Sequence, residues 1–230
     1  MKQLPVTNIS NALNKVTYPL FASIQYDDKR LKRVYKQLMQ MVVFIIAPVL
    51  IFLAVLAEPT FRFLFTEKWL PAVPYFQIIC VTGILYPIHA YNLNVLKVKG
   101  RSDLFLRLEV IKKIIIVLTI VFTLQFGIMA LLYGQIFISI IAFIINTHYT
   151  GKFINYTAWQ QLKDIMPIIL LAVFSGAVII VLDYYLKLHF LQDIIRILGG
   201  SIVGLLVYLA LAQILRFNSL NDIKKLIIKK

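Results

Sequence analysis

The sequence has few cysteines and few acidic residues, and each shortage excludes a class of chemistry. Cys80 is the only cysteine in 230 residues, so the chain cannot form an internal disulfide or a metal site built on several cysteines. Its ten acidic residues include no spaced carboxylates of the kind that hold a catalytic metal, and Asp27 and Asp28 form an isolated pair in a basic segment. Neither a glycine-rich phosphate loop nor a His-Glu-x-x-His motif is present. We therefore expect no enzyme activity, no catalytic residues, no cofactor and no metal.

Charged residues are scarce as well. They make up 15% of the chain, against 60% hydrophobic residues and a mean hydropathy of +0.84. A soluble domain has about 25% charged and about 45–50% apolar residues, so this composition excludes an ordinary soluble domain. The net charge of +14 alone would permit binding to nucleic acid or to an anionic membrane. Because the basic residues stand in short clusters between long apolar runs, we expect membrane lipids as partners and no nucleic acid.

Long uncharged runs predict six membrane-spanning helices, since one span needs about 20 mostly apolar residues. The run 114–149 is too long for a single crossing, and residues 125–127 mark the break within it. Pro48, Pro87 and Pro167 should bend or end their helices. The predicted spans are 38–57, 73–96, 110–126 and 128–149, all within 38–149, followed by 165–185 and 196–215, both within 165–216.

Lysine and arginine are distributed unevenly between the segments that connect these spans, and such a bias predicts orientation. If the basic loop 27–37 is cytoplasmic, the loop 150–164 and the basic tail 217–230 are cytoplasmic too. That side then carries 18 lysines and arginines against 4 on the opposite side. We therefore predict a multi-pass membrane protein with a cytoplasmic C-terminus. The four basic residues on the outer side are Arg62, Lys68, Lys187 and Arg196.

Residues 1–26 differ from the spans, because apolar residues recur there at helical spacing and polar residues fall on the opposite face. The pattern predicts an amphipathic helix from about Thr7 to Ser23. Two interpretations stay open: the helix lies on the bilayer surface, or it stands in a helical bundle with its polar face toward a water-filled cavity. The apolar face holds Val6, Ile9, Leu13, Val16 and Leu20, and the polar face holds Thr7, Asn8, Asn11, Asn14 and Lys15.

Several uncharged polar residues fall within the predicted spans. His89, Asn92 and Gln135 are candidates for the wall of a polar cavity. For each, the alternative is a hydrogen bond between helices, worth about 0.6 kcal/mol on average. In the last span, the spacing of Gly200 and Gly204 permits close helix packing.

Motifs between Leu4 and Arg107 carry a family resemblance. In these motifs, the chain resembles the polysaccharide and lipopolysaccharide O-unit exporters, which belong to the multidrug/oligosaccharidyl-lipid/polysaccharide exporter superfamily. Beyond Arg107 the likeness is mainly one of hydropathy. The motifs are Leu4-Pro5-Val6, Ala12-Leu13-Asn14-Lys15-Val16-Thr17-Tyr18-Pro19, Phe21-Ala22-Ser23-Ile24-Gln25, Phe65-Thr66-Glu67-Lys68-Trp69 with Thr66 where the family often has glycine, and Lys97-Val98-Lys99-Gly100-Arg101-Ser102-Asp103.

The resemblance implies an all-α polytopic membrane fold of fourteen helices, of which this chain would form the C-terminal lobe and the terminal helices. The polar-faced segment 1–26 resembles the eighth helix, and the six spans would be the ninth to the fourteenth. An N-terminal lobe, or a partner that supplies it, would complete the transporter. Met1 is then expected to be an internal methionine or the start of a truncated reading frame.

The implied activity is that of a flippase in the bacterial inner membrane. It would move a polyprenyl-diphosphate-linked oligosaccharide for lipopolysaccharide, capsule or exopolysaccharide biosynthesis. Two alternatives are an ion-coupled small-molecule exporter of the same superfamily, which would need a membrane carboxylate such as Asp183, and an inactive or structural fragment. Lys15 would lie near the diphosphate, Asn11 and Asn14 would bond sugar hydroxyls, and Thr7, Asn8, His89, Asn92 and Gln135 complete the cavity candidates.

Overall fold

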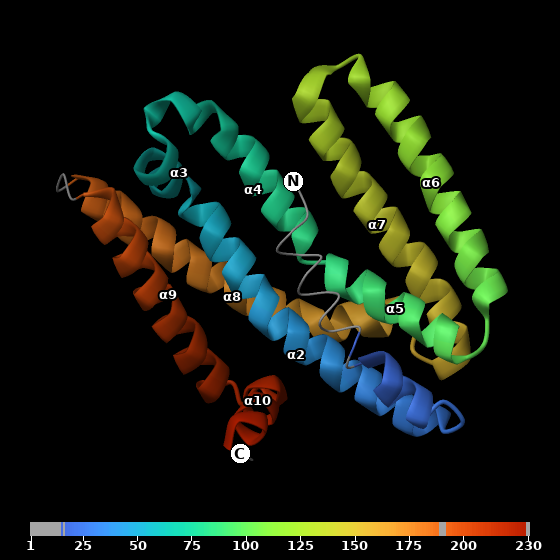
Figure 1. The fold of residues 1–230 in the computed structure, drawn as a ribbon. Coiled ribbons are helices and arrows are strands. Elements are labelled where there is room, and N and C mark those ends of the chain that lie inside the picture. Colours follow the sequence, from blue (N-terminus) through green and yellow to red (C-terminus); the bar gives the residue numbers. More distant parts are fainter. Residues whose placement is uncertain (1–14, 16, 189–191, 229–230) are drawn as a thin grey trace. The chain divides into compact units, whose positions relative to one another are not determined.

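The computed structural model of the chain describes residue 15 and residues 17–188 and 192–228, with only the backbone of 188 and 224–228. These residues are helical almost throughout, and no strand occurs among them (Figure 1). The predicted all-α membrane fold is therefore confirmed. Within the described residues, five stretches are long and apolar enough to cross a bilayer: Asp28–Val55, Glu67–Val98, Gly127–Ile154, Ala158–Lys187 and Asp193–Ile214.

The chain forms two compact units, which we describe separately. Unit 1 comprises the described residues up to Met39 and Leu85–Ile165, and unit 2 comprises Gln40–Ile84 and the described residues from Met166 onward. Helices α2 (Asp28–Val55) and α8 (Ala158–Leu188) contribute to both units. Unit 1 also contains α5 (Tyr86–Val98), α6 (Ser102–Leu124) and α7 (Gly127–Ile154), and unit 2 contains α3 (Ala57–Phe65), η1 (Glu67–Ala72), α4 (Val73–Gly83), α9 (Asp193–Ile214) and α10 (Asn218–Ile228).

The segment expected to be a loop at 27–37 is the beginning of α2. The Asp27 carboxylate accepts a hydrogen bond from the backbone N–H of Arg30 at 2.9 Å, which caps the first turn. The helix therefore starts at Asp28, well before the apolar run that predicts the span. Its charged residues form the polar first turns of a long helix.

The expected loop at 150–164 is also mostly helical. Helix α7 ends at Ile154, where Asn155 adopts a left-handed conformation with φ of 51°. Helix α8 begins at Ala158, because the side chains of Thr157 and Gln160 each accept a hydrogen bond from the other's backbone N–H. This capping box starts a helix inside a segment whose polarity alone indicates a loop. The expected tail 217–230 likewise contains a helix, α10.

The span predicted at 73–96 is interrupted. Helix α4 ends at Gly83 and α5 begins at Tyr86, with Pro87 in the first turn of α5. Proline has no N–H to donate and its ring clashes with the carbonyl four residues earlier, so a helix cannot continue regularly through this position. By contrast, Pro48 and Pro167 lie inside α2 and α8, which do not end there.

Helix α6 starts at Ser102 and so extends the span predicted at 110–126 toward the N-terminus. Each of the other five predicted spans overlaps one of the five apolar stretches, but α6 is not among them by length and composition. The reason is its charged first half, which holds Arg107, Glu109, Lys112 and Lys113. Helices α6 and α7 lie side by side and antiparallel, joined by a tight turn (Figure 1).

Two glycines bring α9 close to α8 within unit 2. A Cβ added to Gly204 would lie 2.7 Å from Cγ1 of Ile179, and one added to Gly200 would lie 3.1 Å from Cγ2 of the same isoleucine. A larger residue at either position would require the Ile179 side chain or one of the two helices to shift. The close packing predicted from the spacing of the two glycines is therefore confirmed.

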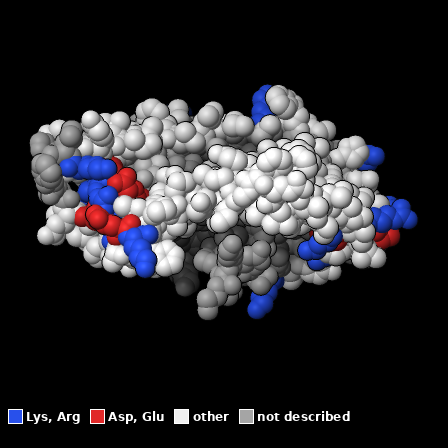
Figure 2. All heavy atoms as spheres, turned by 90° about the horizontal axis from the view of Figure 1, so that it is seen from above, with Lys and Arg blue, Asp and Glu red and all other residues white. Residues whose placement is uncertain are grey.

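Charged side chains at one end of α3, α8 and α9 form an ion-pair network in unit 2. Arg196 is 2% exposed, and its guanidinium donates to both carboxylate oxygens of Asp183, at 2.8 and 2.9 Å, and to Asp193 at 2.7 Å. A buried arginine is tolerated when such bidentate bonds satisfy it. At the left of Figure 2, where Figure 1 has this end of unit 2, acidic and basic side chains gather in one mixed group.

Glu58 extends this network on the side of α3. Its carboxylate accepts hydrogen bonds from Lys187 at 2.9 Å and from Arg62 at 3.1 Å. The bond from Lys187 is the main reason why the pKa of Glu58 is lowered from its ordinary value. Three of the four basic residues predicted on the outer side, Arg62, Lys187 and Arg196, therefore belong to ion pairs in the fold.

We predict that Lys187→Met lowers the melting temperature of the detergent-solubilised chain at neutral pH and that the difference shrinks in acid. Because the pKa of folded Glu58 lies below the ordinary 4.5, the pair stabilises the fold fully above pH 4.5 and loses this effect as the pH falls through the lowered value. Both side chains are about half exposed, so the effect should be small and should weaken with added salt.

Melting curves from pH 7 down to pH 3 test this. Lys68→Met is the matched control, because Lys68 has no ion-pair partner within the described part of the chain, and its difference from wild type should not change with pH. A Lys187→Met defect of equal size at pH 7 and pH 3 would contradict the assignment.

Candidate functional site

A cluster of uncharged polar side chains lies buried in unit 1, where α2, α5, α7 and α8 meet. We call Tyr35, Asn92, Thr150 and Gln161 the buried polar cluster, and each of them is 0% exposed. The Gln161 side-chain oxygen accepts a hydrogen bond from the Tyr35 hydroxyl at 3.1 Å and a longer one from Nδ2 of Asn92 at 3.4 Å. One amide thus joins the first turns of α8 to both α2 and α5.

Backbone carbonyls complete the bonding of this cluster. The hydroxyl of Thr150 donates to the carbonyl of Asn92 at 3.0 Å, which ties α7 to α5. Asn92 also donates to the carbonyl of Ile88 at 3.0 Å, and Gln161 donates to the carbonyl of Tyr156 at 3.2 Å. Such bonds matter here because an unpaired polar group in a low-dielectric interior is costly.

Some buried polar atoms close to the cluster have no hydrogen-bond partner among the described residues. They are the side-chain oxygen of Asn92, both side-chain amide atoms of Asn146 and the hydroxyl of Tyr91. Asn146 precedes Thr150 by one turn of α7 and is 0% exposed. These atoms give the interior of unit 1 a capacity to bond water or a hydroxyl group that its own side chains do not use.

A charged group borders the cluster where α7 passes into α8. Asp164 accepts a hydrogen bond from the Tyr156 hydroxyl at 2.6 Å and pairs with Lys36 at 2.7 Å. Burial, together with the bond to Asp164, raises the pKa of Tyr156, so its hydroxyl stays protonated and acts as a donor. The Tyr35 ring packs edge-on against the Tyr156 ring with centroids 5.8 Å apart.

His89 and Gln135 lie outside the buried polar cluster. His89 is partly buried on α5, and its Nε2 lies 3.3 Å from the Ser139 hydroxyl of α7. Its Nδ1 has no partner in the described part of the chain. Gln135 is exposed and precedes Ser139 by one turn of α7. Of the three candidates within the spans, Asn92 alone is a member of the cluster.

The predicted polar face of the first helix is described only in part. Thr7, Asn8, Asn11 and Asn14 lie outside the described residues, whereas Lys15 is helical and exposed. The residues that follow pack by Thr17 and Phe21, which are 2% and 0% exposed. The Phe21 ring contacts the rings of Tyr35 and Tyr91, with centroids 6.1 and 6.4 Å apart.

This packing corrects one detail of the expected amphipathic helix. Leu20, assigned to the apolar packing face, is 39% exposed, and the buried positions are Thr17 and Phe21. The aromatic contacts of Phe21 decide which face is buried, and the spacing of aliphatic residues does not reveal them. Lys15 and Thr17 lie about 200° apart around the helix, so Lys15 faces away from the buried side.

Sequence reasoning missed most of the cluster. Gln161 falls in the segment expected to be a loop, and Tyr35 falls in the expected basic loop before the first span. The capping box at Thr157 was the one local signal that could have placed Gln161 on a helix. Tyr35 and Gln161 are 126 positions apart, so their contact has no local signature.

Comparisons with known proteins agree with the motifs. Residues 1–74 match the model of a family described as polysaccharide biosynthesis protein. The teichuronic acid biosynthesis protein TuaB of Bacillus subtilis (strain 168) is 32% identical over 101 residues, which are 44% of this chain and 21% of that protein. The lipopolysaccharide biosynthesis protein WzxC of Escherichia coli (strain K12) is 29% identical over 118 residues, which are 51% of this chain and 24% of that protein.

An uncharacterized membrane protein in the cps region of Klebsiella pneumoniae is 29% identical over 119 residues, again 24% of its length. The chain therefore spans about a fifth to a quarter of the curated relatives it matches. No solved structure matches it. The predicted resemblance to polysaccharide exporters is confirmed with partial coverage: the family model covers residues 1–74, and two of the relatives are named as lipopolysaccharide or teichuronic acid biosynthesis proteins.

We predict that Tyr35→Phe destabilises the fold by about 1 kcal/mol, the usual net value of one buried hydrogen bond. The substitution would leave the Gln161 oxygen with only the 3.4 Å bond from Asn92. Denaturant or thermal unfolding in detergent measures the change. Tyr18→Phe is the control because Tyr18 is 43% exposed, and equal stability of the two variants would contradict a structural role for the cluster.

Proposed function

We propose that this chain forms part of a flippase in the bacterial inner membrane. The flippase would move a polyprenyl-diphosphate-linked oligosaccharide from the cytoplasmic to the outer leaflet, for lipopolysaccharide, capsule or exopolysaccharide biosynthesis. The observation that carries the proposal is the match of residues 1–74 to the polysaccharide biosynthesis family, joined to five helices able to cross a bilayer. The role is transport and not catalysis.

The physical problem that such a protein solves is the polar head of its substrate. Sugars and a diphosphate cannot enter hydrocarbon without losing their hydration, so a protein must offer a polar, water-filled path. The polyprenyl tail can stay in the bilayer throughout. Since the relatives are about four times longer than the part they share with this chain, we propose that a second lobe, in the same polypeptide or a partner, closes the path and alternates with this one.

Lys15 is the residue that we propose for the diphosphate. It is exposed, it carries a positive charge, and it has no ion-pair partner within the described residues. Phe21, six residues later, is fixed against Tyr35 and Tyr91, and Tyr35 belongs to the buried polar cluster. The cluster would therefore hold the segment that presents Lys15, while Thr7, Asn8, Asn11, Asn14, His89 and Gln135 remain proposed contacts for sugar hydroxyls.

The alternative of an ion-coupled exporter has less support. The carboxylate that it would need near the membrane, Asp183, is bound by both its oxygens to Arg196. A carboxylate held in this way is not free to take up and release a coupling ion without breaking two charge-assisted hydrogen bonds. The paired state of Asp183 thus favours the flippase.

We predict that Lys15→Ala lowers polysaccharide export at least tenfold without changing the amount of protein in the membrane. The reason is the loss of the cation that would bind the diphosphate. The gene is replaced at its own locus, and surface polysaccharide and lipid-linked precursor are both measured. Lys15→Arg, which keeps the charge, should retain more activity than Lys15→Ala. Normal export by both Lys15→Ala and Lys15→Glu, at wild-type abundance, would refute the proposed role.

We also predict that the C-terminus lies in the cytoplasm. In a Cys80→Ser background, a membrane-impermeant thiol reagent added outside should label Lys187→Cys and should not label Lys224→Cys until the membrane is permeabilised. The bias of 18 against 4 basic residues motivates this expectation. The reverse labelling pattern would invert the topology and with it the proposed direction of transport.

A further inference from the structure

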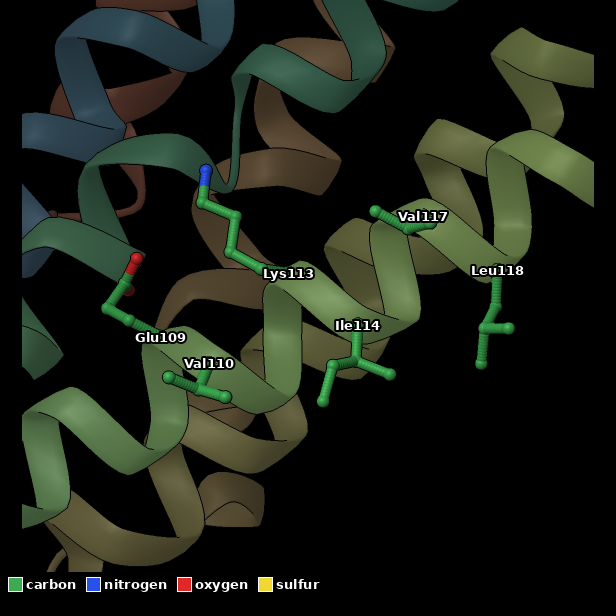
Figure 3. Close-up of a pocket in the computed structure, with 6 residues that line it drawn as sticks. All are labelled: Glu109, Val110, Lys113, Ile114, Val117 and Leu118. Atoms are coloured by element: carbon green, nitrogen blue, oxygen red, sulfur yellow. The ribbon is translucent and has the colours of Figure 1, made fainter.

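The outward face of α6 carries a groove that the proposed function does not use. It runs along this one helix between two rows of side chains spaced four residues apart, and its volume is 420 Å³ (Figure 3). Rows of this spacing form the ridges that border grooves on a helix surface. One row consists of Glu109, Lys113 and Val117, and the other of Val110, Ile114 and Leu118.

The apolar side chains of the groove are open to the surroundings. Ile114 is 54% exposed, Val117 is 58% exposed and Leu118 is 64% exposed. The C-terminal turns of α6 beyond them also expose large apolar side chains, such as Val121 and Phe122. On a helix of a membrane protein, such a face contacts the hydrocarbon chains of lipids.

The stem of Lys113 borders one end of the groove, and its ammonium carries a positive charge that no described residue neutralises. Glu109 pairs with Lys112, which is largely buried, so its carboxylate already serves a different lysine. Lys113 is exposed and has no hydrogen bond or ion pair within the part of the chain that the structure describes. In Figure 3 its side chain extends along the same side of α6 as that of Glu109, away from Ile114 and Leu118.

The length of the apolar part of α6 makes this charge hard to hydrate. The uncharged stretch Ile114–Leu124 is about 16 Å long as a helix, about half of the roughly 30 Å hydrocarbon core. Lys113 is therefore drawn toward the hydrocarbon, although its stem points toward the helix N-terminus and can reach toward the headgroups. An unpaired cation at such a depth is unfavourable, and an anion that enters with it removes much of the penalty.

We propose that this groove binds an anionic phospholipid of the membrane. Its phosphate would pair with the Lys113 ammonium, and one acyl chain would lie along Ile114, Val117 and Leu118. The positive charge of Lys113 favours an anionic headgroup, and the exposed apolar side chains favour contact with the acyl chain of the lipid. The site is independent of the proposed flippase function, because it lies on the outward face of α6 and does not involve Lys15.

Quenching by brominated lipids tests the site on the full chain in bilayers. Trp69→Phe and Trp159→Phe remove the native indoles, and Leu118→Trp places a single reporter in the groove. Vesicles contain mixtures in which either phosphatidylglycerol or phosphatidylcholine carries brominated chains. We expect phosphatidylglycerol to bind beside the reporter about fivefold more strongly than phosphatidylcholine, the factor typical of one lysine acting on an anionic headgroup.

Lys113→Gln should reduce this preference to about one, and Lys113→Arg should keep it. The matched control is a reporter at Leu206→Trp on α9, which is equally exposed at 61% and should show no preference with or without Lys113. If Leu118→Trp does not fold, as judged by circular dichroism, Val117→Trp replaces it. Equal binding of both lipids in the wild-type groove, a preference that survives Lys113→Gln, or a reporter that no brominated lipid quenches would each overturn the proposal.

Discussion

Hydrocarbon offers no hydrogen bonds, and this constraint governs how a chain with 60% hydrophobic residues can fold. Helices satisfy the hydrogen-bonding groups of the backbone. The buried polar side chains must find their own hydrogen-bond or ion-pair partners. In the interior of unit 1, neutral hydrogen bonds of the Gln161 amide join α8 to Tyr35 and Asn92. In unit 2, the buried Arg196 guanidinium is satisfied by charged partners, Asp183 and Asp193.

The two solutions differ in their consequences for function. A buried bidentate ion pair is rigid, because breaking it leaves an uncompensated charge, so the ends of α8 and α9 are held firmly together. Neutral hydrogen bonds are weaker and can be exchanged with water or hydroxyl groups. The side-chain atoms of Asn92 and Asn146 that have no partner among the described residues could bond such groups, and they lie in the unit that also contains Lys15.

Much of the fold could be predicted from hydropathy, because the bilayer imposes a length on each apolar run. The turn between α6 and α7 and the close approach at Gly204 follow from local sequence. The helix starts at Asp28 and Ala158 were missed because charge was given more weight than capping side chains. The buried polar cluster could not be predicted, since the contact of Tyr35 with Gln161 exists only after α2 and α8 have packed.

Lys15 and Lys113 show why the charge of a residue does not reveal its role. Both are exposed lysines in unit 1 without an ion-pair partner among the described residues, yet their surroundings differ. The segment after Lys15 buries Thr17 and Phe21 against the protein, so Lys15 belongs to a helix whose other face is fixed in place. Lys113 is followed by exposed Ile114, Val117 and Leu118, which a polar path would not tolerate but lipid chains would cover. These different neighbours are the reason why we propose a polar substrate for Lys15 and a membrane lipid for Lys113.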